Sequence, residues 1–163
     1  MSELIHLGSL KGHLARPVGN GPFPTVIVIQ EWWGLDSQTQ SIADRFAQEG
    51  YLSFAPDLYH GELAQLGDGD TAMKLVQKYG PKAYLDLQSL FDALKSHPDF
   101  NGKIGSVGFC FGGRMSLTLS LSRPANHLRS ATYKSQSPCA WVIRRRGCFN
   151  PCWNSCRIRQ IAR

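Results

Sequence analysis

Hydrophobic residues along the first 124 positions alternate between short β-branched runs and longer stretches with helical spacing. Residues 25–29 form a run without polar alternation, which is typical of a strand buried on both faces in a parallel sheet. Residues 51–55 and 103–107 predict two further strands of this kind. The looser alternation of residues 4–17 predicts an opening β-hairpin.

Amphipathic stretches separate these strands and predict helices. One helix can be capped by Asp36, carries its apolar residues on one face and ends at Gly50. Further helices are predicted over residues 71–79, 82–95 and 114–121. The first two are separate because Gly80 and Pro81 interrupt the pattern. Strands that alternate with helices predict an α/β fold with a largely parallel sheet.

The alternation stops near residue 127. Beyond that point the chain shows neither helical nor strand spacing, apart from one short strand predicted near residues 131–133. We therefore expect two regions. Residues 1–127 form the α/β part of the chain, and residues 128–163 form a basic, cysteine-rich tail that is irregular or non-native.

Length and composition predict one soluble domain. A chain of 163 residues with 42% hydrophobic and 18% charged residues is large enough for a single core. No apolar run approaches the roughly 18 residues that a membrane span needs, so no membrane partner is expected. The N-terminus lacks the basic and apolar regions of a signal peptide, and we expect a cytoplasmic location.

The net charge of +6 is unevenly distributed along the chain. Residues 1–110 hold all 12 acidic residues and 8 basic ones, whereas residues 111–163 hold 10 basic residues and no acidic one. The arginine triplet at residues 144–146 lacks an accompanying aromatic or groove-reading motif, so nucleic-acid binding is not expected. A protein that binds a partner through its basic tail remains an alternative.

Four of the five cysteines lie in the tail, at Cys139, Cys148, Cys152 and Cys156. Pairs of cysteines at this spacing occur in structural zinc sites. However, Pro151 disrupts a helix there and no pair of histidines supports such a site. We expect no metal.

The fifth cysteine lies in a glycine-rich stretch, residues 103–113, with the letters KIGSVGFCFGG. A buried strand here runs into Gly-x-Cys-x-Gly and then a helix, which is the layout of a nucleophile elbow with Cys110 at its apex. Gly108 and Gly112 leave room for the tight turn, with Gly113 beside them, and the helix directs its N–H groups at the thiolate. A buried, inert cysteine or a phosphate-binding loop are the alternatives.

Glu31 follows the strand at residues 25–29 and therefore lies at the carboxyl ends of the strands, where α/β sheets place their sites. The backbone N–H groups of Trp32 and Phe111 are positioned to form an oxyanion hole. The base is harder to assign. After Cys110 the chain has no acidic residue, and its one histidine there, His127, fits a capping or surface role better.

These motifs together resemble the dienelactone hydrolase family (carboxymethylenebutenolidases) of the α/β-hydrolase superfamily. The resemblance runs from about residue 3 to about residue 124, with the order and spacing of the family. It is carried by residues 11–17, 28–35, 43–45, 49–51, 55–59 and 105–113, which include the strings QEWWG and GFCFGG.

The resemblance implies an α/β-hydrolase-like fold and hydrolysis of a small-molecule ester or lactone through a thioester acyl-enzyme, without a metal or organic cofactor. It implies that Cys110 is the nucleophile, that Glu31 controls its protonation, and that Trp32 and Phe111 supply the oxyanion hole. The family completes its triad with a later aspartate and histidine and binds a substrate carboxylate through arginines.

The chain departs from the family in these last respects. It lacks the later aspartate and histidine, and no arginine occurs between Arg45 and Arg114. The sheet therefore looks truncated after the elbow and its helix, which would leave the elbow strand with an exposed apolar edge. The alternative to an active hydrolase is a catalytically inactive, truncated fragment.

Overall fold

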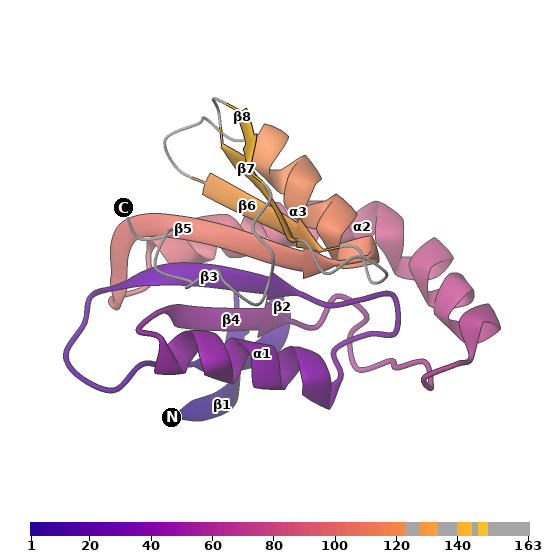
Figure 1. Ribbon diagram of the computed structural model, residues 1–163. Coiled ribbons are helices and arrows are strands. Elements are labelled where there is room, and N and C mark those ends of the chain that lie inside the picture. The colour runs from indigo at the N-terminus through magenta and orange to yellow at the C-terminus, as the bar shows by residue number, and fades with distance from the viewer. Residues whose placement is uncertain (123–127, 134–139, 145–146, 150–163) are drawn as a thin grey trace.

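A mixed eight-stranded sheet organises the molecule, with strands in the order β1-β2-β4-β3-β5-β6-β7-β8 (Figure 1). The computed structural model describes residues 1–122, 128–133, 140–144 and 147–149 of the chain. The strands are β1 (Ser2–Leu7), β2 (Leu10–Ala15), β3 (Phe23–Ile29), β4 (Leu52–Pro56), β5 (Phe100–Phe109), β6 (Leu128–Tyr133), β7 (Ala140–Arg144) and β8 (Gly147–Phe149). The helices are α1 (Ser37–Gln48), α2 (Gly69–Lys95) and α3 (Phe111–Leu121).

The central strands of this sheet are parallel. β3 pairs in parallel with both β4 and β5, and β5 pairs in parallel with β6. The β1–β2 hairpin is antiparallel and joins the sheet through β4. These pairings confirm the predicted α/β fold, its largely parallel centre and its opening hairpin.

Helices cover both faces of the sheet, with α1 on one face and α2 and α3 on the other (Figure 1). Val26 and Val28 of β3 pack with the apolar face of α1. The alternating residues Ile27 and Ile29 pack in the second, larger cluster with residues of α2 and α3. β3 is therefore buried on both faces, which explains why its sequence shows no polar alternation.

α2 is one helix of 27 residues, so the predicted break at residues 80–81 is wrong. Ala72 and Leu75 precede Pro81 and are buried in the larger cluster. Ala83 and Leu87 follow it and are buried in the same cluster. Pro81 itself is exposed. A proline inside a helix costs about 3 kcal/mol, which the burial of both halves against one core offsets.

The described residues beyond 127 lie in the three strands β6, β7 and β8. β6 pairs with β5 in parallel, so the elbow strand has a neighbour on that side. β7 and β8 extend the sheet by antiparallel pairing, while β6 covers the strand predicted near residues 131–133. Strand pairing uses backbone N–H and C=O groups that almost every residue carries, so it can occur without the side-chain alternation that signals a strand.

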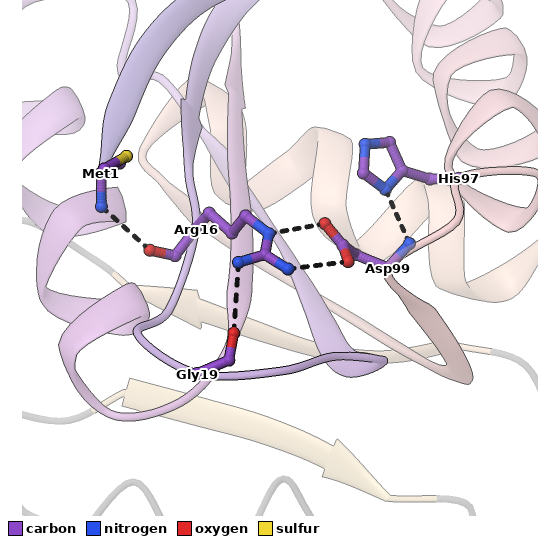
Figure 2. A network of polar contacts seen from close by, with 5 residues as sticks. All are labelled: Met1, Arg16, Gly19, His97 and Asp99. Carbon is purple, nitrogen blue, oxygen red and sulfur yellow. Dashed lines mark hydrogen bonds and ion pairs between the residues drawn. The ribbon is translucent and has the colours of Figure 1, made fainter.

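A polar network fastens the hairpin to the start of β5 (Figure 2). The Arg16 guanidinium donates from Nε to Asp99 Oδ2 at 2.7 Å and from Nη2 to Asp99 Oδ1 at 3.0 Å. It also donates to the Gly19 carbonyl at 3.3 Å, while the Asp99 amide donates to His97 Nδ1 at 3.2 Å. The Arg16 amide donates to the Met1 carbonyl at 2.9 Å, which closes the open end of the hairpin.

The Arg16–Asp99 pair makes stability depend on pH in a defined direction. Hydrogen bonds from Arg16, and then its charge, lower the pKa of Asp99 below the ordinary value of 3.8. The stabilisation is therefore fully present above pH 3.8 and is lost as the pH falls through the lowered pKa. We expect Asp99→Asn to lower the urea midpoint at neutral pH, and the gap from the parent chain to close in acid.

Urea unfolding over a pH series measures this gap. Glu3→Gln removes a carboxylate from an exposed position on β1 and should leave the midpoint unchanged at every pH. A gap for Asp99→Asn that stays constant down to the acid limit would contradict a charge-based role for the pair.

Candidate active site

Cys110 lies at the turn between β5 and α3, with φ +49° and ψ −108°. Residues other than glycine rarely adopt a positive φ, and each such residue costs about 1–3 kcal/mol. The thiol is free and the residue is exposed. The turn therefore presents a sulfur atom at the carboxyl end of the central strand next to β3.

The backbone packs so closely around this turn that two positions have no space for a side chain. A Cβ atom on Gly108 would lie 2.0 Å from the Gly112 carbonyl oxygen and 2.6 Å from the Gly113 amide nitrogen. A Cβ atom on Gly112 would lie 2.3 Å from the Gln30 carbonyl oxygen and 2.5 Å from that of Ile29. Gly112 thus brings the first turn of α3 into direct contact with the end of β3.

Glu31 comes directly after that contact. It is partly buried and forms an isolated bridge with Gly34, whose amide donates to the Glu31 carbonyl at 3.3 Å. The Trp33 carbonyl accepts a hydrogen bond from the Ala64 amide at 2.8 Å, which joins this loop to the one after β4. The two loops are also joined by the buried Gln30, whose Oε1 accepts from the Leu58 amide at 3.1 Å.

The electrostatics couple Cys110 to Glu31. Partial burial of the sulfur raises the pKa of the Cys110 thiol, and the negative charge of Glu31 raises it further. A hydrogen bond from the Phe111 amide acts in the opposite direction. Burial likewise raises the pKa of Glu31, against a hydrogen bond from the Trp33 side chain that lowers it. The structure therefore brings together the sulfur, the carboxylate and the Phe111 amide.

Trp32 lies in the same loop and is partly buried. Its ring meets that of Trp33 edge to face at 5.0 Å between centroids. A Cβ atom on Gly69 would lie 3.6 Å from the Trp32 ring, so the ring packs against the first turn of α2. The use of the Trp32 amide in an oxyanion hole stays a prediction.

Tyr59 is a site residue that the sequence analysis missed. It is fully buried just after β4, and its ring stacks on Tyr79 at 5.5 Å and packs on Phe111 at 6.0 Å. Burial, followed by the charge of Cys110, raises its pKa. The available signal was its position, because Tyr59 follows a buried strand just as Glu31 does.

Three histidines make polar contacts with residues other than the predicted site residues. His13 Nε2 lies 2.8 Å from Asp44, and His97 belongs to the network at the opposite end of β5. His60 Nε2 lies 3.8 Å from Asp86, and its ring lies 5.5 Å from the Tyr79 ring. His127 lies outside the described residues, so the structure tests no role for it.

Within the described residues, no three side chains of His, Cys, Asp or Glu lie close enough together to hold a metal ion. Of the cysteine series in the tail, Cys148 lies in β8, and the other three lie outside the described part of the chain. In the same ranges, no helix combines the length and apolar composition that crossing a membrane requires.

The sheet, its two helical layers and the strand-to-helix elbow define an α/β-hydrolase-like fold, and solved structures share it. The solved structure named m3DLH superposes with a TM-score of 0.67 at 26% identity, over 85% of this chain and 60% of its own. The dienelactone hydrolase from Anabaena variabilis superposes with a TM-score of 0.58 at 20% identity, over 82% of this chain and 62% of its own.

Residues 10–138 match the dienelactone hydrolase family, and the chain belongs to that family. It is 39% identical over 119 residues to Protein usf of Aquifex pyrophilus, which is 66% of this chain and 48% of that protein. It is 26% identical over 132 residues to the carboxymethylenebutenolidase of Pseudomonas putida, 74% of this chain and 56% of that enzyme. The chain thus spans about half the length of these relatives. The family match continues past residue 124, where the sequence resemblance ended, and takes in β6.

The close packing at the elbow predicts a large effect of one methyl group. Gly108→Ala places a Cβ atom against backbone that cannot move aside, and we expect a loss of at least about 2 kcal/mol in the free energy of unfolding. Gly69→Ala is the matched control, because its Cβ atom meets the Trp32 ring at an ordinary 3.6 Å. It should change stability by no more than about 0.5 kcal/mol. Equal effects of the two substitutions in urea unfolding would contradict the steric account.

Proposed function

We propose that this chain carries the nucleophilic site of an ester or lactone hydrolase, with Cys110 as the nucleophile. The observation that carries the proposal is the geometry of Cys110. It has a strained backbone, a free thiol on an exposed residue, glycines packed against β3 and a carboxylate on the adjacent strand end. Backbone strain of this kind is concentrated at functional sites. Membership of the dienelactone hydrolase family supports the same reaction class.

The proposed reaction begins with the Cys110 thiolate attacking the carbonyl carbon of a small ester or lactone. The carbonyl electron pair moves to oxygen, where the amides of Phe111 and Trp32 donate hydrogen bonds to the oxyanion. The oxyanion collapses, the carbon–oxygen bond to the leaving group breaks, and the thiol's proton goes to the departing alkoxide. Water then hydrolyses the thioester, which releases the acid and restores the thiol.

The proposed role of Glu31 is to control the proton on Cys110. Burial raises the pKa of both groups. The charge on Glu31 raises the pKa of the thiol further above its ordinary value of 9.0. The site therefore favours one negative charge over two. A neutral thiol beside an ionised Glu31 is the resting form, and the thiolate forms when the carboxylate takes up a proton.

A second candidate is a chain that binds or is acylated by an ester without turning it over. The observation that favours it is the absence of any acidic residue after Cys110, where the family has an aspartate followed by a histidine. In this candidate residues 1–127 supply the N-terminal part of the hydrolase domain, and residues 128–163, which contain no Asp, Glu or His, supply no base. Acylation needs the nucleophile, whereas release of the acyl group also needs a base for water.

Cys110→Ala separates a catalytic thiol from a bystander. We expect the parent chain to release p-nitrophenol from p-nitrophenyl acetate and to carry an acetyl group on Cys110 in the mass spectrum. Both should be lost in Cys110→Ala. Acetylation of the parent followed by turnover supports the hydrolase, and acetylation without turnover supports the second candidate. Equal release by the two proteins would remove Cys110 from the reaction.

Glu31→Gln should affect alkylation and hydrolysis in opposite directions. Because the charge of Glu31 raises the pKa of Cys110, removing it lowers that pKa and leaves more thiolate at neutral pH. We expect severalfold faster alkylation of Cys110 by iodoacetamide and slower ester hydrolysis. Glu49→Gln removes an exposed carboxylate at the end of α1 and should change neither rate. Slower alkylation in Glu31→Gln would contradict the assigned electrostatics.

A further inference from the structure

The Tyr59 hydroxyl is a buried hydrogen-bonding group without a partner. The residue is 0% exposed, and its hydroxyl oxygen has no hydrogen-bond partner among the described residues. Buried hydroxyl groups are nearly always paired, because leaving water without a new hydrogen bond is unfavourable. An orphaned buried hydroxyl is explained if its partner forms in another state of the site, such as one in which a nearby group is charged.

The surroundings of Tyr59 indicate which state this is. β4, β3 and β5 are neighbours in the parallel part of the sheet, and their carboxyl ends lead to Tyr59, Glu31 and Cys110 respectively. The Tyr59 ring stacks on Tyr79 with 23° between the planes and packs on Phe111, the residue next to Cys110. With aromatic rings on two sides, the ring holds its hydroxyl in one place.

The titration of Tyr59 agrees with this placement. Burial raises the pKa of Tyr59 most, and the negative charge of Cys110 raises it further. A tyrosine with a raised pKa keeps its proton when Cys110 ionises. It is therefore a donor at the moment when the sulfur becomes a strong acceptor.

We propose that Tyr59 is a positioning residue that donates a hydrogen bond from its hydroxyl to the thiolate of Cys110. The inference rests on the proposed function in taking Cys110 as the group that ionises. The hydroxyl is buried, so it serves a group of the protein rather than a ligand arriving from solvent. Together with the Phe111 amide it gives the thiolate two donors, which offset the repulsion by Glu31.

Other polar groups in this region contact Tyr79, on which the Tyr59 ring stacks. On α2, Tyr79 donates to Glu62 at 2.5 Å, and Lys78 pairs with the same carboxylate. The His60 ring lies 5.5 Å from the Tyr79 ring. Arg114, in the first turn of α3, is exposed. The groups that shift the pKa of the sulfur in this structure are Glu31 and the Phe111 amide.

Tyr59→Phe tests the inference, because it removes the hydroxyl and keeps both ring contacts. The readout is the rate at which iodoacetamide alkylates Cys110 across a pH series, followed on the Cys110 peptide by mass spectrometry. We expect the rate at neutral pH to fall about tenfold, as for the loss of a hydrogen bond to a charged group. The midpoint should move to higher pH while the plateau in alkali is unchanged.

Tyr51→Phe is the matched control. Tyr51 is also buried, but it packs on Phe46 on the face of the sheet covered by α1. Its alkylation profile should match that of the parent chain. Thermal unfolding is the second measurement, and Tyr59→Phe should not lower the melting temperature, because its hydroxyl has no partner to lose among the described residues.

An alkylation profile of Tyr59→Phe that superposes on the parent profile would overturn the inference, as would equal shifts in both variants. The outcome is independent of turnover. A shifted profile in a chain that hydrolyses no ester supports the thiolate contact and contradicts the hydrolase, whereas hydrolysis with an unshifted profile does the reverse.

Discussion

The contact between the elbow and the end of β3 is the constraint on which the site depends. Ile29 and Gly108 are register partners in neighbouring parallel strands, and Gly112 lies against the carbonyl groups of Ile29 and Gln30. Side chains larger than hydrogen at either glycine would push the first turn of α3 away from β3. The close approach brings Cys110 into electrostatic range of Glu31, the residue after Gln30. The close packing at the two glycines therefore places Cys110 where the charge of Glu31 affects its pKa.

Glu31 and Cys110 compete for one negative charge. Burial disfavours the charged form of both Glu31 and Cys110, and the charge of Glu31 further disfavours ionisation of Cys110. The Phe111 amide favours the thiolate, and the Trp33 side chain favours the carboxylate. In the proposed mechanism, small changes in these hydrogen bonds decide which group holds the proton. The backbone fixes the distance between the two groups, and the donors around them decide the protonation state.

The sequence predicted the parts of this arrangement that are local. β3 carries a β-branched run, and the elbow is a contiguous glycine motif, so both could be located from the sequence. Tyr59 could not, because its burial and its ring contacts depend on α2 and α3. The continuity of α2 across Pro81 was missed for a similar reason, since burial of both halves overrides the local preference. β7 and β8 depend on backbone pairing with β6 and with each other, and their side chains carry no periodic signal that would predict this pairing.

The placement of the residues separates the two halves of the proposed reaction along the chain. In the proposed mechanism, the groups that form and stabilise the thiolate are Glu31, Tyr59 and the Phe111 amide, at the ends of three adjacent parallel strands. Hydrolysis of the thioester needs a base near an incoming water, and Glu31 can act there only after it has returned the proton that it took from Cys110. Acylation therefore leaves the Glu31 carboxylate protonated, whereas release needs it ionised. These are opposite demands on one carboxylate. In a family that adds a later histidine and aspartate, these demands fall on different groups, and the first half of the fold needs only to make the nucleophile.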